Sequence, residues 1–545
     1  MAYYPARSLS SSVPSIIRER HHPVRGGRFW RSSFGVLGVL ATLALVLAGC
    51  GSSSSSGGQS GPKFGGTLNV ALDSDVVTLD PLKSTALVDR EAMFNIYETL
   101  VSVDAKNSVQ PDLATAWSYP SPTQVLFTLR TGVQFQDGTP FNADAVVTNI
   151  NRILNTATSP RHSELATVAS VQAVDTTHVQ FNLTKPFAPL LATLTDRAGM
   201  ILSPTAIQSL GDQLGNGPTN AGTGPFMFQT FVKGDHLTFQ RNPHYWQKDS
   251  AGHALPYLDA ITYHPITDGT VRYNNLQTST INVAEDLDPT DVPTAKSNPN
   301  LVYSQIAGLS FFGFELNTQK APFDNVHVRR AVAYAVNRQE ILTGVLHNIG
   351  VLSQGPISPS SWAYSASIAP FTYDTTTAKS ELAQAGVASV SFDLLITSGS
   401  PLLSQEAQFI QSELQPAGIT VNIKQETFAA LLSDSSSHNF QAALLGWSGR
   451  PDPDGNMYSW FHTGGGNNDM RYSNSQVDSL LEDARASSDQ TKRASDYQQA
   501  EKLMLQDSPY VFINHGVSEQ ATTKKVHNFV LLPTTIMVFT RTYLS

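Results

Sequence analysis

The sequence predicts an α/β protein built from more than one lobe. Without its N-terminal leader the chain still has 496 residues, which is more than a single hydrophobic core usually accommodates. Strand-like and helix-like segments alternate along this length. In the second half, apolar alternation at 392–396 and 419–423 flanks a helical pattern at 407–414. That β-α-β order indicates a partly parallel sheet.

The predicted elements start near Phe64, where alternation over 65–72 indicates a first strand. Strands are also expected at 125–129 and 179–183, with a turn at 136–140 that contains Gly138. Asn142 is a suitable N-cap for a helix that continues to Ile153. Asp324 or Asn325 is expected to cap a second helix.

The N-terminus has the pattern of a secretory leader. Five arginines within 18–31 precede an apolar run at 34–49 that ends in small residues and in Cys50, the single cysteine of the chain. Residues 51–61 read GSSSSSGGQSG, a composition typical of a flexible spacer. The leader therefore predicts an exported protein with a spacer before its folded part.

Charge and composition exclude several classes of partner. The formal net charge is −9, and because residues 1–49 hold six arginines and one acidic residue, the rest of the chain carries −14. An acidic exported chain is a poor match for nucleic acid, whose phosphates need a basic surface. A single cysteine excludes disulfides within the chain.

Leu47-Ala48-Gly49-Cys50 resembles the lipobox of bacterial lipoproteins. The resemblance implies that 1–49 is a signal peptide and that Cys50 is lipidated, which anchors the protein to the periplasmic or extracellular face of the cell membrane. Several acyl chains on one residue would make the anchoring durable. The alternative is a leader cut elsewhere, with Cys50 an incidental small hydrophobic residue.

A series of short motifs, in order over nearly the whole mature chain, resembles the family 5 extracellular solute-binding proteins, the peptide, dipeptide and nickel receptors of bacterial ABC importers. The motifs are Gly66-Thr67-Leu68, Thr78-Leu79-Asp80-Pro81, Ile96-Tyr97-Glu98-Thr99-Leu100-Val101, Pro111-Asp112-Leu113-Ala114, Phe127-Thr128-Leu129-Arg130, Asp137-Gly138-Thr139-Pro140-Phe141, Gly222-Thr223-Gly224-Pro225-Phe226, Arg241-Asn242-Pro243, Pro322-Phe323-Asp324, Val328-Arg329-Arg330-Ala331-Val332, Gly446-Trp447 and Pro451-Asp452-Pro453-Asp454.

The resemblance implies a periplasmic-binding-protein type II (cluster C) fold, with two lobes and a ligand cleft between them. The implied segments are a signal peptide at 1–49, the anchored cysteine and linker at 50–63, the first lobe at 64–312 with an inserted subdomain at about 101–222, the second lobe at 313–513, and a return to the first lobe at 514–545. The chain is expected to cross between lobes near 311–317 and 511–515. The implied partners are a small solute, foremost a peptide, and the subunits of a membrane permease.

Peptide receptors of the family anchor the ligand's ammonium with an acidic residue after the Gly-Trp motif. Here Arg450 appears at that place, after Trp447. A guanidinium repels an ammonium and favours a carboxylate or phosphate. Either the amino anchor has moved to Asp452, Asp454 or Asp75, or the ligand is not a simple peptide. The opposing interpretation makes Arg450 a solvated loop cation and the two aspartates turn residues beside prolines.

Further ligand contacts are proposed from position in the chain. Trp447 is either a pocket wall or a buried tryptophan. An extended edge at Asp75, Val76 and Val77 would pair with ligand backbone, with Asp75 as a possible ammonium acceptor. Phe311 and Phe312 either line the cleft or belong to the core, and the loop with Trp362 and Tyr364 would cover the site.

Catalytic motifs such as G-x-S-x-G, H-E-x-x-H and the P-loop are absent from the sequence. We expect no catalytic residue, no cofactor and no preformed metal site, and a protein that is not an enzyme. Three functions stay open. The first is a peptide receptor of an ABC importer; the second is the same receptor for another solute (oligosaccharide, opine-like acid or nickel chelate); the third is a secreted hydrolase.

Overall fold

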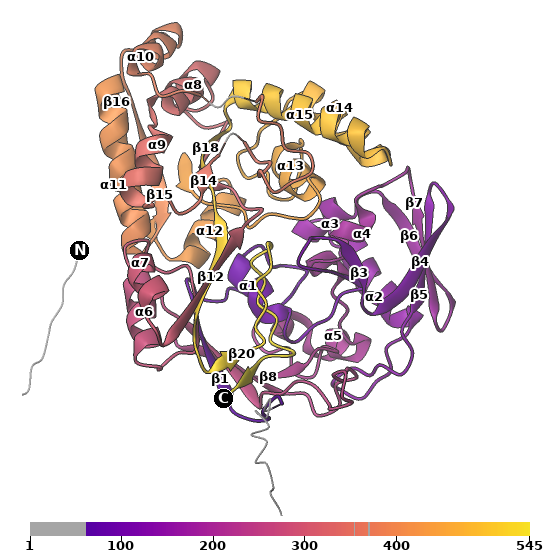
Figure 1. Cartoon of the computed structure of the whole chain (residues 1–545). Coiled ribbons are helices and arrows are strands. Elements are labelled where there is room, and N and C mark those ends of the chain that lie inside the picture. The colour runs from indigo at the N-terminus through magenta and orange to yellow at the C-terminus, as the bar shows by residue number, and fades with distance from the viewer. Residues whose placement is uncertain (1–60, 354, 369–370) are drawn as a thin grey trace, which may run out of the picture. The chain divides into compact units, whose positions relative to one another are not determined.

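The structure, a computed structural model, describes residues 61–545 except 354 and 369–370 (Figure 1). The leader, Cys50 and nearly all of the Gly/Ser segment lie outside the described residues, so the predictions of a signal peptide and of lipidation stay predictions. The two lobes described below belong to one compact unit, Ser60–Ser545.

The first lobe is organised around a seven-stranded mixed sheet. Its strand order is β12 (Leu301–Ala307), β19 (Val517–Thr523), β11 (Val283–Glu285), β1 (Thr67–Leu72), β10 (Ala260–Pro265), β9 (His236–Arg241) and β8 (Phe226–Val232). The central strand β1 runs parallel to β10 and β11. Side chains on both faces of β1 are buried, since Val70 and Ala71 belong to different hydrophobic clusters. The expected first strand is confirmed.

A four-stranded antiparallel sheet forms a separate layer within the first lobe. Its order is β4 (Ala114–Ser121), β5 (Gln124–Leu129), β7 (His178–Leu183) and β6 (Val168–Asp175), and α2 (Ala143–Leu154) packs against it (Figure 1). The other first-lobe elements are α1 (Leu87–Met93), β2 (Val101–Val103), β3 (Val109–Pro111), α3 (Pro160–Glu164), α4 (Leu190–Thr193), η1 (Arg197–Gly199), α5 (Pro204–Leu210), η2 (Gly211–Gly215), α6 (Gly269–Gln277), α7 (Val292–Ser297), β20 (Val526–His527) and β21 (Tyr543–Leu544).

The second lobe contains a six-stranded sheet and most of the longer helices. The sheet order is β14 (Val351–Leu352), β18 (Tyr510–His515), β13 (Phe312–Leu316), β17 (Ala442–Leu444), β15 (Val390–Thr397) and β16 (Ile419–Glu426). Its helices are α8 (Val326–Ala335), α9 (Arg338–Glu340), the π-turn η3 (Ile341–Val345), α10 (Thr375–Gln384), α11 (Pro401–Leu414), η4 (Gln415–Ala417), α12 (Phe428–Ser436), α13 (Asp454–Phe461), α14 (Ser475–Ala486) and α15 (Gln490–Asp507).

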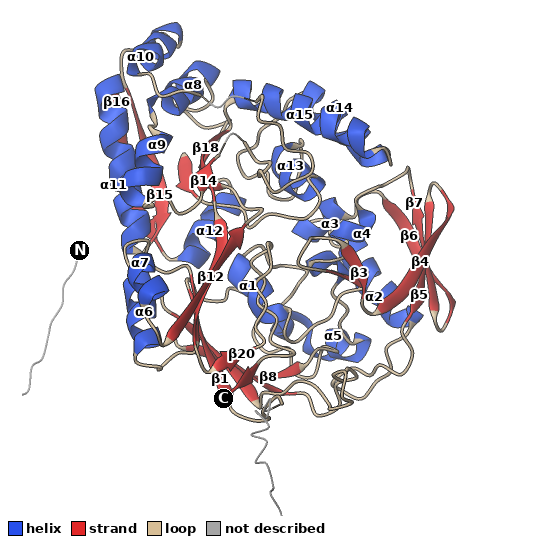
Figure 2. Ribbon diagram, viewed as in Figure 1, coloured by secondary structure: helices blue, strands red, loops and turns tan. Residues whose placement is uncertain are grey.

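The β-α-β prediction for the second half is confirmed. Strands β15 and β16 are parallel neighbours, and α11, which connects them through η4, packs alongside both (Figure 2). Ala407, Ile410 and Leu414 of α11 are buried in the cluster that also contains the apolar residues of β15. The α/β fold class follows directly from this arrangement.

Local chemistry explains where several elements begin. The side chain of Asn142 accepts a hydrogen bond from Ala145 N at 3.0 Å and caps α2, and Asn325, not Asp324, caps α8. Gly222 and Gly224 sit where no side chain fits, because a Cβ on Gly222 would lie 1.8 Å from the carbonyl oxygen of Ile96. The turn at Gly138 has the expected positive φ of 84°.

The chain passes between the two large sheets twice, and the two passages are adjacent. One is the segment 308–311 between β12 and β13, and the other is Gly516 between β18 and β19. Gly516 N donates to Ser310 Oγ at 3.1 Å, and the ring of His515 lies 2.9 Å from the carbonyl oxygen of Ser310. The passages thus lie slightly before the expected 311–317 and slightly after 511–515, with 312–316 forming β13.

Candidate functional site

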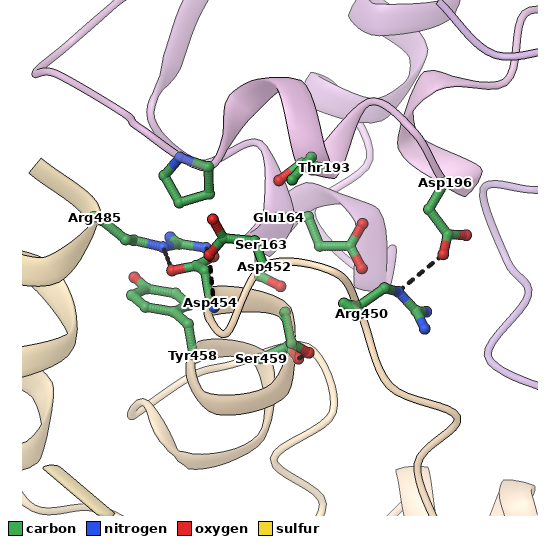
Figure 3. Close-up of a pocket in the computed structure, with 13 residues that line it drawn as sticks. Ser163, Glu164, Thr193, Asp196, Arg450, Asp452, Asp454, Tyr458, Ser459 and Arg485 are labelled. Carbon is green, nitrogen blue, oxygen red and sulfur yellow. Dashed lines mark hydrogen bonds and ion pairs between the residues drawn. The ribbon is translucent and has the colours of Figure 1, made fainter. Parts of the chain in front are cut away.

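A small pocket of about 30 Å³, partly open to solvent, is lined by residues of both lobes (Figure 3). The first lobe supplies Ser163, Glu164, Pro189, Ala192, Thr193 and Asp196, and the second supplies Arg450, Asp452, Asp454, Gly455, Tyr458, Ser459 and Arg485. Helices α3 and α4 form one side, and α13 with the loop before it forms the other (Figure 1). Pockets between domains are common ligand sites.

Hydrogen bonds close the seam around this pocket. Ala188 N donates to the carbonyl oxygen of Arg485 at 2.9 Å, Gly466 N donates to Ser163 Oγ at 3.1 Å, and Lys185 pairs with Glu482. On the other side of the pocket, Arg90 of α1 donates to Ser448 Oγ at 2.8 Å. The described lobes are therefore in direct contact, in a closed arrangement.

Asp196 is the charged centre of the seam. Its Oδ2 atom lies 2.9 Å from Arg90 Nη2 of the first lobe and 2.9 Å from Arg450 Nε of the second. Arg197 Nε lies 3.5 Å from its other oxygen. Burial alone would raise the pKa of Asp196, but Arg450, Arg90 and Arg197 together outweigh burial and hold the pKa below its ordinary value.

The interpretation of Arg450 as a solvated loop cation is wrong. Its side chain is 8% exposed, its guanidinium lies 4.0 Å from the centre of the Trp447 ring, and its Nη1 donates to the carbonyl oxygen of Gly449 at 2.7 Å. Asn456 fixes the loop by accepting from both Arg450 N and Trp447 Nε1. Figure 3 shows the guanidinium directed toward Asp196, away from the other labelled ion pair.

Asp452 and Asp454 line the pocket, but neither carboxylate is free. Asp454 makes a bidentate pair with Arg485 at 2.8 and 2.9 Å, and Asp452 accepts from Arg493 at 2.7 Å. The interpretation of Asp454 as a simple turn residue is therefore wrong, because it is buried at the start of α13. Burial raises the pKa of the Asp452 carboxyl despite the opposing effect of Arg493.

The aromatic candidates lie mainly in the core of the second lobe. Trp447 and Phe311 exchange backbone hydrogen bonds, and both rings pack against Trp460. Neither residue lines the pocket. Phe312 is half-buried against the core around α11. Trp362 is half-buried, and its ring lies 5.2 Å from the guanidinium of Arg493. It therefore packs against the arginine that pairs with Asp452.

The edge proposed at Asp75, Val76 and Val77 is occupied by contacts within the first lobe. Asp75 accepts from Gly234 N at 2.8 Å, and Lys233 Nζ bonds the carbonyl oxygens of Val76 and Val77. These residues do not line the pocket. Of the nine predicted ligand contacts, the structure places only Arg450 and Asp452 in its wall.

Several pocket residues were not identified from the sequence, above all Asp196, Glu164 and Arg485. Asp196-Arg197 does carry a signal, because this charged pair stands between the apolar stretches 190–194 and 198–202. Charges inside an apolar stretch indicate buried pairing. The partners of Asp196 are 106 positions before it and 254 after it, so the sequence offered no way to identify them.

A second group of acidic residues lies in the first lobe, at the carboxyl ends of the parallel strands β1 and β11, and two of them, Glu91 and Glu285, are buried. Asp73 follows β1, Glu285 ends β11, Asp286 follows it, and Glu91 approaches from α1. Burial raises the pKa of Glu91 to about 8 and, with neighbouring carboxylates, raises the pKa of Glu285 well above its ordinary value. Both shifts favour the protonated form of these two glutamates.

Among the described residues, no helix is long and apolar enough to cross a membrane, and no group of three or more histidine, cysteine, aspartate or glutamate side chains is placed to hold a metal ion.

The Asp196→Asn variant should lose stability, because it removes the carboxylate that compensates Arg90 and Arg450. Breaking a buried ion pair from one side typically costs about 3–5 kcal/mol. We expect a lower unfolding midpoint in urea. The matched control is Asp212→Asn, which disrupts an exposed pair with Lys83 and should leave the midpoint unchanged. Equal midpoints for Asp196→Asn and the unmodified protein would show that the seam does not depend on this carboxylate.

Glu91 should make stability fall with rising pH. Its pKa is about 8 in the fold against an ordinary 4.5, so the unfolded chain ionises first. The contribution is fully present below pH 4.5 and is lost as the pH rises through 8. The free energy of unfolding of Glu91→Gln should therefore depend less on pH between 5 and 8 than that of the unmodified protein. Asp104→Asn, at an exposed carboxylate, is the control; identical slopes for all three proteins would contradict the prediction.

Comparison with known proteins identifies the family to which this chain belongs. The model of the bacterial extracellular solute-binding proteins, family 5, matches residues 108–468. The chain is 29% identical to the probable D,D-dipeptide-binding periplasmic protein DdpA of Escherichia coli, over 86% of this chain and 92% of that protein.

Solved structures show the same architecture. One is the periplasmic binding protein DppA of Helicobacter pylori in complex with the peptide STSA, with a TM-score of 0.81 and 28% identity, covering 88% of this chain and 98% of that one. Another is AgaA of A. tumefaciens R10 in complex with agropinic acid, with a TM-score of 0.81 and 25% identity, covering 88% and 99%. The predicted periplasmic-binding-protein fold is confirmed.

Proposed function

We propose that this chain, which belongs to the family 5 bacterial extracellular solute-binding proteins, captures extracellular peptides by closing its lobes and delivers them to the permease of an ABC importer. The observation that carries the proposal is a pocket walled by both lobes, next to two adjacent interlobe passages. A ligand that contacts both walls favours the closed state by its differential affinity for that state.

Peptide capture is supported by the relatives. The similar proteins include one named for D,D-dipeptides and one solved with a bound peptide. A non-peptide solute is the second candidate, and the specific observation in its favour is Arg450 together with the similarity to a protein solved with agropinic acid. Both candidates use the same closing motion.

No chemical step is part of the proposal. General acid or base catalysis needs a carboxyl group that is free to exchange a proton with the substrate. In the pocket, Asp454 is held by Arg485, Asp452 by Arg493 and Asp196 by arginines of both lobes. These pairs suit a receptor better than a hydrolase.

Ligand-dependent closure is testable with the purified mature chain. Pooled di- to tetrapeptides, oligosaccharides and Ni²⁺ are added separately, and melting temperature and radius of gyration from X-ray scattering are measured. A bound peptide should raise the melting temperature, because it binds only the native state, and should reduce the radius of gyration. Stabilisation by sugars or Ni²⁺ but by no peptide would contradict peptide capture, and hydrolysis of a bound compound would contradict the receptor role.

We further propose that the protein is anchored at Cys50 after removal of residues 1–49, with the Gly/Ser segment as a spacer. In host cells, Cys50→Ala should move the protein from the membrane fraction to the aqueous fraction. The control is Ser52→Ala, which leaves the lipobox-like motif intact. Recovery of Cys50→Ala in the membrane fraction at the same level as the control would refute the lipid anchor.

A further inference from the structure

Four buried arginines meet at the interlobe seam: Arg90, Arg161 and Arg197 of the first lobe and Arg450 of the second. We refer to them as the arginine cluster. Resting on the proposed receptor function, we propose that this cluster binds a carboxylate of the ligand other than a peptide's C-terminal one, so that the cargo is an acidic peptide or another carboxylated solute.

The first observation is an excess of positive charge. The side chains of the cluster are between 0% and 8% exposed. Their ion-pair partners among the described residues are Asp196, shared by three of the arginines, and Glu164, which lies 2.9 Å from Arg161. A third carboxyl group, that of buried Asp89, also interacts with the charge of Arg197. Four guanidiniums therefore face three carboxyl groups, which leaves an excess of positive charge in a buried place that a folded protein normally avoids.

The second observation is a set of buried donors without partners. No described group accepts a hydrogen bond or ion pair from these nitrogens: Arg90 Nε, Arg161 Nε and Nη2, Arg197 Nη2 and Arg450 Nη2. Each cluster member contributes at least one of them. Buried donors of this kind are ordinarily satisfied, and a ligand carboxylate at the seam would supply an acceptor.

The electrostatic state of the cluster agrees with a missing anion. Burial, followed by the charge of Arg90, lowers the pKa of Arg450 well below its ordinary value. Burial, followed by the charge of Arg161, lowers the pKa of Arg197 to about 9. The mutual repulsion of like charges is therefore only partly relieved by Asp196. A carboxylate bound among them would reduce it further.

One member of the cluster, Arg450, lines the pocket. Arg450, Asp196 and Glu164 belong to the pocket wall, while Asp452 and Asp454 are already neutralised by their own arginines (Figure 3). The pocket wall therefore includes one guanidinium with an unpartnered nitrogen, Nη2 of Arg450, and no unpaired aspartate. A planar carboxylate matches the fork of a guanidinium, which donates two parallel hydrogen bonds. Glu164, the remaining carboxylate of the wall, is paired with Arg161.

The test measures affinity by isothermal titration for two matched pools of di- to tetrapeptides, one containing a single glutamate and one with glutamine in its place. Glutarate represents a non-peptide acid, and inorganic phosphate represents another oxyanion. We expect the glutamate pool to bind about tenfold or more tightly than the glutamine pool, as charge-assisted hydrogen bonds predict. Binding of glutarate in addition would identify a carboxylated solute as the broader cargo.

Variants of Arg450 connect the preference to the cluster. Arg450→Gln should reduce the preference to about twofold or less, and Arg450→Lys, which keeps the charge but loses the fork, should leave an intermediate preference. The matched control is Arg338→Gln, since Arg338 is a buried arginine of α9 that also has an unpartnered Nε. This control should keep the full preference. Circular dichroism checks that each variant is folded.

Equal affinity for the two pools, a preference that survives in both Arg450 variants, or binding of phosphate alone would overturn the inference. The proposed function fails differently. Equal binding of both pools with lobe closure in X-ray scattering rejects the carboxylate site and leaves the receptor intact. A carboxylate preference without closure keeps the site and contradicts the closing mechanism.

Discussion

One buried carboxylate lies at the centre of the closed arrangement of this protein. Asp196 caps the short turn η1 that follows α4, and it faces an arginine from each lobe at 2.9 Å. Such a contact exists only while the lobes are together, because Arg450 and Asp196 belong to different lobes. Three guanidiniums hold the pKa of Asp196 low, so the charge that joins the lobes is present throughout the physiological pH range.

Two further ion pairs lie on the second-lobe side of the pocket. Asp454 with Arg485 and Asp452 with Arg493 hold α13, α14 and α15 together behind the pocket. These pairs fix the positions of the helices more than they stabilise the fold, since desolvation offsets much of the attraction within a buried ion pair. On this face of the second lobe, the carboxylates of Asp452 and Asp454 are therefore already paired with arginines. The remaining imbalance lies in the arginine cluster, at the place where a ligand would enter.

The two adjacent passages between the sheets explain how such a seam can open. Segment 308–311 and Gly516 are joined by hydrogen bonds of Ser310, and they are the chain connections between the two large sheets. A hinge of a few residues can absorb the backbone change while each lobe keeps its own core. Closure then brings α3 and α4 toward α13 without rearranging either sheet.

Sequence reasoning succeeded where the signal was local or spread over many motifs. Asn142 and Asn325 cap helices through contacts that span only three residues, and the parallel pair β15 and β16 was evident from apolar alternation. The family was identified because ordered motifs carry information collectively. Most individual ligand contacts could not be identified in this way. Trp447 and Phe311 are core residues, and the chain at Asp75 to Val77 makes hydrogen bonds to Lys233 and Gly234.

By itself, the sequence determined the α/β class, the leader-like N-terminal pattern and the position of an arginine shortly after Gly446-Trp447, because each of these features depends on neighbouring residues. Only the tertiary structure decided which charges meet. Arg90 and Asp196 are more than a hundred positions apart in the sequence, and so are Asp196 and Arg450. The net charge of a pocket depends on all the charged side chains that the fold brings together around it. A loop arginine is solvated or buried according to what packs over it, and that is a property of the folded chain alone.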